Sequence, residues 1–111
     1  MNFTDNKEYI TVFPEGRLDL NTSQILEKEL IKIVEEEKRH LLINFRSIDY
    51  LHSSGIRLMV TLHNRLLDQG NKLLLCEIND SVKKIIDFVD LYGIVKIFKD
   101  EAETGKYIRS L

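Results

Sequence analysis

Two serines and a glycine occupy a position where a hydroxyl group could do chemistry. Ser53, Ser54 and Gly55 lie between a loop and a predicted helix. The first backbone N–H groups of a helix have no partner within the helix, and the helix dipole favours negative charge there. A phosphate carried by one of these hydroxyls would therefore be stabilised. The serines could instead serve only as helix caps, because serine is one of the preferred N-cap residues.

The elements on either side of the serines are predicted from the spacing of apolar residues. The run 41–45, Leu-Leu-Ile-Asn-Phe, is short and rich in large apolar residues, which predicts a buried strand. We expect a loop over residues 46–52. From Ile56 onward the apolar period changes to 3.6, which predicts a helix. Its broad apolar face would contain Ile56, Met59, Val60, His63, Leu66 and Leu67.

The N-terminal part of the chain predicts two strands. Residues 3–4 could form a short edge strand, followed by a turn at 6–8. Residues 9–13 are dense in β-forming side chains and predict a strand that continues past Pro14. Proline suits an edge strand or a bulge better than a central position. We expect residues 16–19, Gly-Arg-Leu-Asp, to close this strand as a turn.

Further helices and strands follow at regular spacing. Asn21 and Gln24 resemble a capping box, and the apolar spacing after them predicts a helix up to about Lys38. The remaining predictions are a strand over 72–78, a helix capped by Asn79 or Asp80 and ended near Tyr92, a short strand over 94–98 and a closing helix within 100–111.

This order of elements predicts the α/β class. Strands that alternate with helices imply a mostly parallel sheet of about four to five strands with an antiparallel edge, packed by about four helices. The chain of 111 residues suits a single domain, 1–111. The working surface of such a sheet lies where strands lead into helices. The turns at Asp19 and Ser53 both follow strands, so we expect them to meet.

Composition argues against several classes of function. Sixteen basic and eighteen acidic residues give a net charge of -2, so there is no electrostatic reason to expect a nucleic acid partner. The N-terminus does not resemble a signal peptide, and no apolar run is long enough to span a membrane. We therefore expect a cytoplasmic protein that does not bind a membrane.

The other reactive side chains predict neither a metal site nor an enzyme. Cys76 lies alone in an apolar run and should be a buried free thiol. His40, His52 and His63 are too dispersed to suggest zinc. Although His52 adjoins Ser53, neighbours on a turn usually point in different directions, so adjacency does not make a catalytic triad. No glycine-rich phosphate loop is present, and we expect no cofactor.

The turn at 16–19, the segment 43–58 and the stretch 73–98 resemble a STAS domain of the bacterial anti-sigma factor antagonist type. The resemblance covers nearly the whole chain. In that family, the first serine of an Asp-Ser-Ser/Thr-Gly signature is phosphorylated by a partner kinase, and it aligns with Ser53. Asp19 matches the family's acidic residue near the phosphorylated serine.

His52 is a departure from the family pattern, which usually has aspartate before the phosphorylated serine. A carboxylate would repel an incoming phosphate, whereas an imidazole is neutral or cationic near physiological pH and could attract it. The histidine could instead be a loop residue that is half packed on the sheet.

The resemblance implies a binding switch. The unmodified domain would bind an anti-sigma factor serine kinase and so release a sigma factor, phosphorylation of Ser53 would prevent binding, and a serine phosphatase would restore it. The expected partner-binding residues are Asp19, His52, Ser53, Ser54, Gly55, Ile56 and Arg57. The alternative is a STAS scaffold or accessory subunit that binds a protein or small ligand without being phosphorylated. We expect a monomer, because no long apolar stripe is left unassigned.

Overall fold

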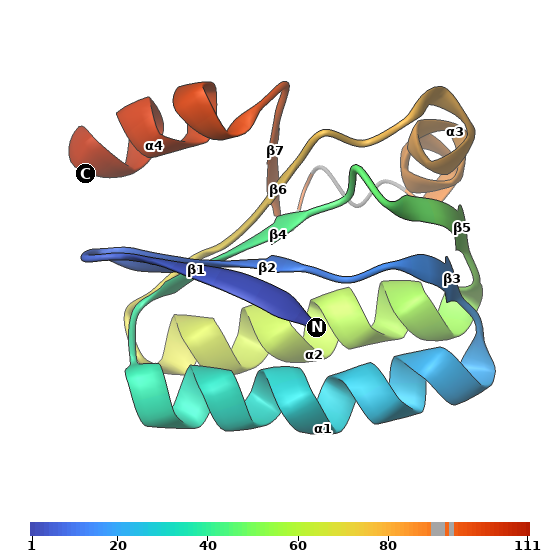
Figure 1. Ribbon diagram of the computed structural model, residues 1–111, viewed down its shortest axis with the longest axis horizontal. Coiled ribbons are helices and arrows are strands. Elements are labelled where there is room, and N and C mark those ends of the chain that lie inside the picture. Colours follow the sequence, from blue (N-terminus) through green and yellow to red (C-terminus); the bar gives the residue numbers. More distant parts are fainter. Residues whose placement is uncertain (90–92, 94) are drawn as a thin grey trace.

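A mixed five-stranded sheet forms the centre of the computed structural model, which describes residues 1–89, 93 and 95–111 (Figure 1). The strands follow the order β1 (Asn2–Asn6), β2 (Tyr9–Phe13), β4 (His40–Asn44), β6 (Leu73–Cys76) and β7 (Lys96–Phe98). β1 is antiparallel to β2, and all other neighbours are parallel. A second, smaller sheet pairs β3 (Gly16–Leu18) with β5 (Ile48–Leu51) in parallel.

Helices cover both faces of the main sheet. α1 (Leu20–Glu37) and α2 (Ser53–Asp68) lie side by side on one face, and α4 (Glu101–Arg109) lies on the other (Figure 1). α3 (Asp80–Val89) packs beside β5. The predicted class, a mostly parallel sheet with an antiparallel edge and about four helices, is therefore confirmed within the described residues.

The core has two parts, one on each face of the sheet. The larger part joins the inner sides of α1 and α2 to the sheet, through residues such as Leu30, Ile43 and Met59. The smaller part lies under α4 and contains Ile108 and Cys76. Cys76 is a buried free thiol, as predicted, and burial raises its pKa to about 12. Burial of the apolar side chains in both parts of the core is the main force that holds the layers together.

β2 differs from its prediction in position and in length. It ends at Phe13, before Pro14, and it is an inner strand between β1 and β4. Proline has no N–H to donate, so the ladder stops where proline begins. The edge strand is β1, which is longer than the predicted 3–4.

The predicted turn at 16–19 and the predicted loop at 46–52 were wrong in part, because each contains a short strand. β3 and β5 pair with each other, and their partners Leu18 and Leu51 are both buried. Strands of three and four residues are too short to show a period of their own. Their pairing depends on residues about thirty positions apart in the chain.

The start of α1 and the buried face of α2 also differ from the predictions. The capping box of α1 is formed by Asp19 and Thr22 rather than by Asn21 and Gln24. In α2, Leu67 is 60% exposed although it was predicted to face the core. The buried residues of α2 are Gly55, Leu58, Met59, Leu62 and Leu66. This stripe is rotated because α2 is covered by α1 as well as by the sheet.

The C-terminal predictions hold where the structure describes them. Asn79 caps α3, since its side chain accepts a hydrogen bond from the Val82 N–H at 2.9 Å. β6, β7 and α4 lie within the predicted ranges 72–78, 94–98 and 100–111. Tyr92 and Ile94 lie outside the described residues.

Candidate functional site

The pairing of β3 with β5 brings two strand-to-helix turns together. Because the strands are parallel, the helices that follow them, α1 and α2, start next to each other (Figure 1). The His52 N–H donates to the Leu18 carbonyl at 2.9 Å, so the residue after β5 contacts the last residue of β3. The prediction that the turns at Asp19 and Ser53 meet is confirmed.

Gly55 makes this close approach possible. A Cβ added at Gly55 would lie 2.5 Å from Leu51 Cδ1 and 3.2 Å from Leu18 Cβ. The shorter of these distances is a steric clash with the end of the Leu51 side chain, so a larger residue would force either that buried side chain or α2 to shift. Gly55 is buried. Its evident role is to let the first turn of α2 lie against β3 and β5.

Asp19 caps α1. Its carboxylate accepts the Thr22 backbone N–H at 3.1 Å, and Thr22 Oγ1 accepts the Asp19 N–H at 3.0 Å. Hydrogen bonds to the carboxylate, first from the Thr22 backbone N–H and second from the Thr22 side chain, lower the pKa of Asp19. The start of α1 therefore has a carboxylate that stays ionised at neutral pH.

His52 caps α2, a role predicted for Ser53 or Ser54. Its Nδ1 accepts the Ser54 N–H at 3.2 Å, and the backbone of His52 is extended, as in other N-caps. Nδ1 also lies 3.1 Å from Ser54 Oγ and 3.4 Å from Ser53 Oγ. Because Nδ1 accepts the Ser54 N–H, this nitrogen carries no proton in the capping contact.

The two serine hydroxyls have different surroundings. Ser53 is the first residue of α2 and is exposed. Ser54 is half-buried, and its hydroxyl donates to Ser23 Oγ at 3.5 Å, across to α1. The side chain of Ser23 is buried. Of the two, Ser53 is the more accessible to another protein.

The remaining predicted residues lie at the edge of this region. Ile56 is half-buried and packs against the core, and Arg57 is exposed. Arg57 lines a small hollow of about 110 Å³ between the starts of α1 and α2, together with Ser54 and Leu20. The structure thus gathers the predicted residues around one surface, although Gly55 lies beneath it.

Sequence reasoning missed three residues around the serines. Leu20 is 54% exposed at the first position of α1, and Ser23 contacts Ser54. Arg17 on β3 lies over the Tyr50 ring on β5, 4.1 Å from its centroid. Leu20 could have been noticed as an apolar residue directly after the aspartate that ends a strand. Ser23 and Arg17 become relevant only through contacts with distant residues.

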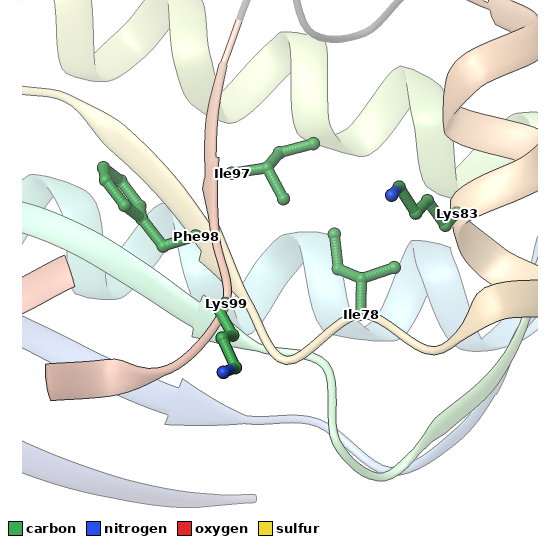
Figure 2. Close-up of a pocket in the computed structure, with 5 residues that line it drawn as sticks. All are labelled: Ile78, Lys83, Ile97, Phe98 and Lys99. Atoms are coloured by element: carbon green, nitrogen blue, oxygen red, sulfur yellow. The ribbon is translucent and has the colours of Figure 1, made fainter. Parts of the chain in front are cut away.

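A larger hollow lies between α3, β7 and the segment that follows β6 (Figure 2). It has a volume of about 370 Å³ and is lined by Ile78, Lys83, Ile97, Phe98 and Lys99 (Figure 2). None of these residues belongs to the predicted site. In the described ranges, no group of three or more His, Cys, Asp or Glu side chains is arranged to hold a metal ion. No described helix has the length and apolar character needed to cross a membrane.

Comparison with known proteins identifies the family. The STAS domain family matches residues 1–104, and the chain belongs to this family. The anti-sigma F factor antagonist of Paenibacillus polymyxa is 21% identical over 87 residues, which are 78% of this chain and 74% of that protein.

Solved structures share the fold at low sequence identity. An anti-sigma factor antagonist from Mycobacterium paratuberculosis aligns with a TM-score of 0.87 at 16% identity, covering 97% of this chain and 92% of the other. The anti-sigma factor antagonist SpoIIAA in its unphosphorylated form aligns with a TM-score of 0.74 at 16% identity, covering 99% of this chain and 100% of the other. The phosphorylated form of SpoIIAA from Bacillus aligns with a TM-score of 0.71 at 15% identity, covering 96% and 97%.

Proposed function

We propose that this protein is an anti-sigma factor antagonist whose binding to an anti-sigma factor serine kinase is controlled by phosphorylation of Ser53. The exposed hydroxyl of Ser53 at the start of α2, beside the start of α1, is the observation that carries the proposal. The name of the Paenibacillus relative supports the first part, and the two forms of SpoIIAA support the second by analogy. This function requires a cytoplasmic protein.

The binding surface is formed by exposed residues around Ser53. Leu20 offers an apolar contact, and Arg57 offers a positive charge on the same side of the two helices. Asp19, His52, Ser53, Ser54 and Ile56 complete the surface, while Gly55 supports it from below. A partner that covers this surface removes Ser53 from water and brings its hydroxyl to the kinase.

Phosphorylation would change the charge of this surface without refolding the domain. A phosphate on Ser53 adds about −1.5 to −2 charge at pH 7. The N-terminus of α2 accommodates an anion, so the domain itself is not destabilised. The partner would instead have to bury this charge, which is costly without a matching cation. A serine phosphatase would remove the phosphate and restore binding.

Incubation with the candidate serine kinase of the same genome and ATP tests the modification. Mass spectrometry of the digested protein should locate phosphate on Ser53, and Ser53→Ala should abolish it. The matched control is Ser54→Ala, which should still be phosphorylated because Ser54 is turned toward Ser23. Phosphate on Ser54 alone, or none on either serine, would contradict the proposal.

Replacement of Ser53 by aspartate tests the switch itself. Ser53→Asp should weaken kinase binding in titration calorimetry, while the free energy of unfolding changes by less than about 0.5 kcal/mol, because the side chain is exposed at a helix start. Equal binding by the aspartate variant and the unmodified protein would count against the switch.

The second candidate is a STAS scaffold or accessory subunit that binds a protein or small ligand without being phosphorylated. His52 is the observation that keeps it open, since it stands where the family usually has aspartate. The capping contact to Ser54 means that the histidine is suited to a purely local role. A protein that binds its partner equally well with Ser53→Asp and Ser53→Ala, and that no kinase modifies, would favour this candidate.

A further inference from the structure

β1 forms a free edge of the main sheet. It pairs with β2 on one side, and no other described strand lies on its outer side. Alternate backbone N–H and C=O groups of an edge strand point outward and can pair with a strand from another chain. β1 is therefore a candidate for strand addition.

An apolar groove lies under this edge, between β1 and α1. Phe3 pairs with Val12, whose side chain is in the core on the α1 face, so Phe3 lies on that face too. Phe3 is nevertheless 61% exposed. A hollow of about 360 Å³ is lined by Phe3, Ile10 and Ile33 among other residues. We call β1 together with this hollow the β1 groove.

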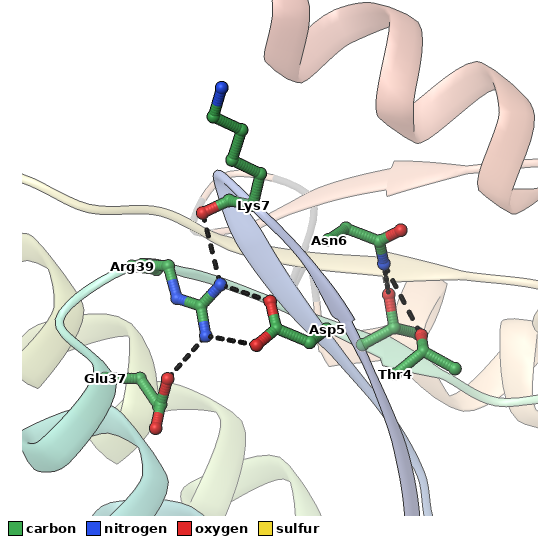
Figure 3. Close-up of polar contacts among 7 residues, drawn as sticks. Thr4, Asp5, Asn6, Lys7, Glu37 and Arg39 are labelled. Carbon is green, nitrogen blue, oxygen red and sulfur yellow. Dashed lines mark hydrogen bonds and ion pairs between the residues drawn. The ribbon is translucent and has the colours of Figure 1, made fainter.

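The β1 groove is held in place by Arg39, which follows α1. Its guanidinium pairs with Asp5 at 2.5 Å, donates to the Lys7 carbonyl at 3.1 Å and contacts Glu37 (Figure 3). These contacts tie the β1–β2 turn to the end of α1. A fixed edge loses little conformational freedom when a partner binds, which favours docking.

The charges around the β1 groove favour a basic occupant. An adjoining hollow of about 290 Å³ contains Ile25, which is 63% exposed. The charged residues that line the two hollows are Glu15, Glu29, Lys32, Glu36 and Glu37. Four of these five are acidic, and since Glu37 already pairs with Arg39, the excess is carried by Glu15, Glu29 and Glu36 against Lys32. A second copy of this chain paired through β1 would bring two acidic linings together, so a basic partner is the better match.

We propose that the β1 groove binds an extended segment of a partner protein, with apolar and basic side chains on the side that faces the groove. The segment would add a strand to β1 through backbone hydrogen bonds. Every second side chain would face the groove. Its apolar side chains would lie near Phe3 and Ile33, and its basic side chains would reach Glu29 and Glu36 on α1.

A peptide with this pattern tests the proposal. The probe is a fluorescein-labelled heptapeptide, Thr-Lys-Thr-Val-Thr-Lys-Thr, titrated with the full chain and followed by fluorescence anisotropy. We expect saturable binding, and Phe3→Glu should raise its Kd at least about tenfold, which corresponds to ~1.4 kcal/mol. Glu36→Lys should raise it similarly. Leu67→Glu is the matched control, since Leu67 is equally exposed but lies on α2. It should leave the Kd within about twofold.

Two further comparisons separate strand addition from simple charge attraction and from the Ser53 switch. The same peptide with alternate backbone nitrogens methylated keeps its charge but cannot pair as a strand, so it should bind at least about tenfold more weakly. Ser53→Asp should leave peptide binding unchanged, because Ser53 lies outside the β1 groove. Failure of the Ser53 switch would therefore leave this result intact.

Several outcomes would overturn the proposal. They are no saturable binding of the peptide, equal binding by Phe3→Glu and the unmodified protein, and equal binding of the methylated peptide. A concentration-dependent dimer in light scattering that Phe3→Glu abolishes would also overturn it, because the occupant would then be a second copy. Circular dichroism checks that each variant is folded. Glu36→Lys and the methylated peptide keep the test decisive if Phe3→Glu does not fold.

Discussion

The two strand-to-helix turns of this protein have the same construction but different charges. β3 leads through Asp19 into α1, and β5 leads through His52 into α2. Both cap residues have extended backbones, and both side chains accept an N–H group from the first turn of the helix. Asp19 does so with a carboxylate, whereas His52 does so with an imidazole nitrogen.

Because of this difference, the two helix starts differ in how well they accommodate an added anion. At α1 the charge of Asp19 already compensates the positive end of the helix dipole. At α2 an imidazole nitrogen accepts the Ser54 N–H, so no carboxylate compensates the helix dipole there. A negative group added beside His52 therefore finds an uncompensated dipole. Ser53 would therefore be better suited than a residue at the start of α1 to carry a phosphate.

The largest expected effect comes from Gly55, where the two turns touch. Gly55→Val should lower the free energy of unfolding by about 1–3 kcal/mol, because the side chain would overlap Leu51 and Leu18. Urea denaturation measures this change. Asn64→Val is the matched control, since Asn64 is exposed on the same helix. Equal losses in both variants would mean that helix propensity, and not contact between the turns, causes the effect.

Removal of the histidine cap should have a smaller effect. His52→Ala should destabilise the protein by about 0.5–1 kcal/mol, because the Ser54 N–H loses its acceptor. Thermal and urea unfolding at neutral pH measure the loss. His63→Ala provides a comparison with a histidine in the middle of the same helix. An unchanged stability of His52→Ala would show that the hydrogen bond to Ser54 contributes nothing.

Giving α2 an aspartate cap like that of α1 should raise the free energy of unfolding. His52→Asp should keep the cap and add a charge at the start of α2, which stabilises the protein by about 0.3–1 kcal/mol at low salt. The gain should shrink as sodium chloride is added, because salt screens the interaction. A gain that is independent of salt would point to a cause other than the helix dipole.

Replacing Asp19 by a neutral capping residue should change the free energy of unfolding least. The change should be seen mainly in how this free energy depends on pH. Asp19→Asn keeps a capping side chain but removes the charge. The folded pKa of Asp19 is lowered from 3.8. Its contribution is therefore complete above the unfolded pKa and is lost as pH falls through the folded pKa. Unfolding measured between about pH 3 and 7 should show a steeper acid loss for the unmodified protein than for Asp19→Asn. Parallel curves would contradict this assignment.

Local spacing in the sequence predicted the long elements well. α1, α2 and the central strand β4 were found within a few residues of their observed bounds, because a sustained apolar period reports which side of an element is buried. The apolar period predicted α2 from Ile56 onward, and the helix begins three residues earlier, at Ser53. The resemblance carried by the Ser53 segment was confirmed when the chain proved to belong to the STAS domain family.

Only the tertiary structure decided how the site is assembled. β3 and β5 were missed because their pairing energy comes from residues about thirty positions away, which no local pattern contains. That pairing makes Asp19 and His52 the two caps, leaves Ser53 exposed and turns Ser54 toward Ser23. The sequence by itself determined which hydroxyl groups stand at a helix start. Their surroundings depend on contacts between distant segments, so only the folded chain determined which of them faces water.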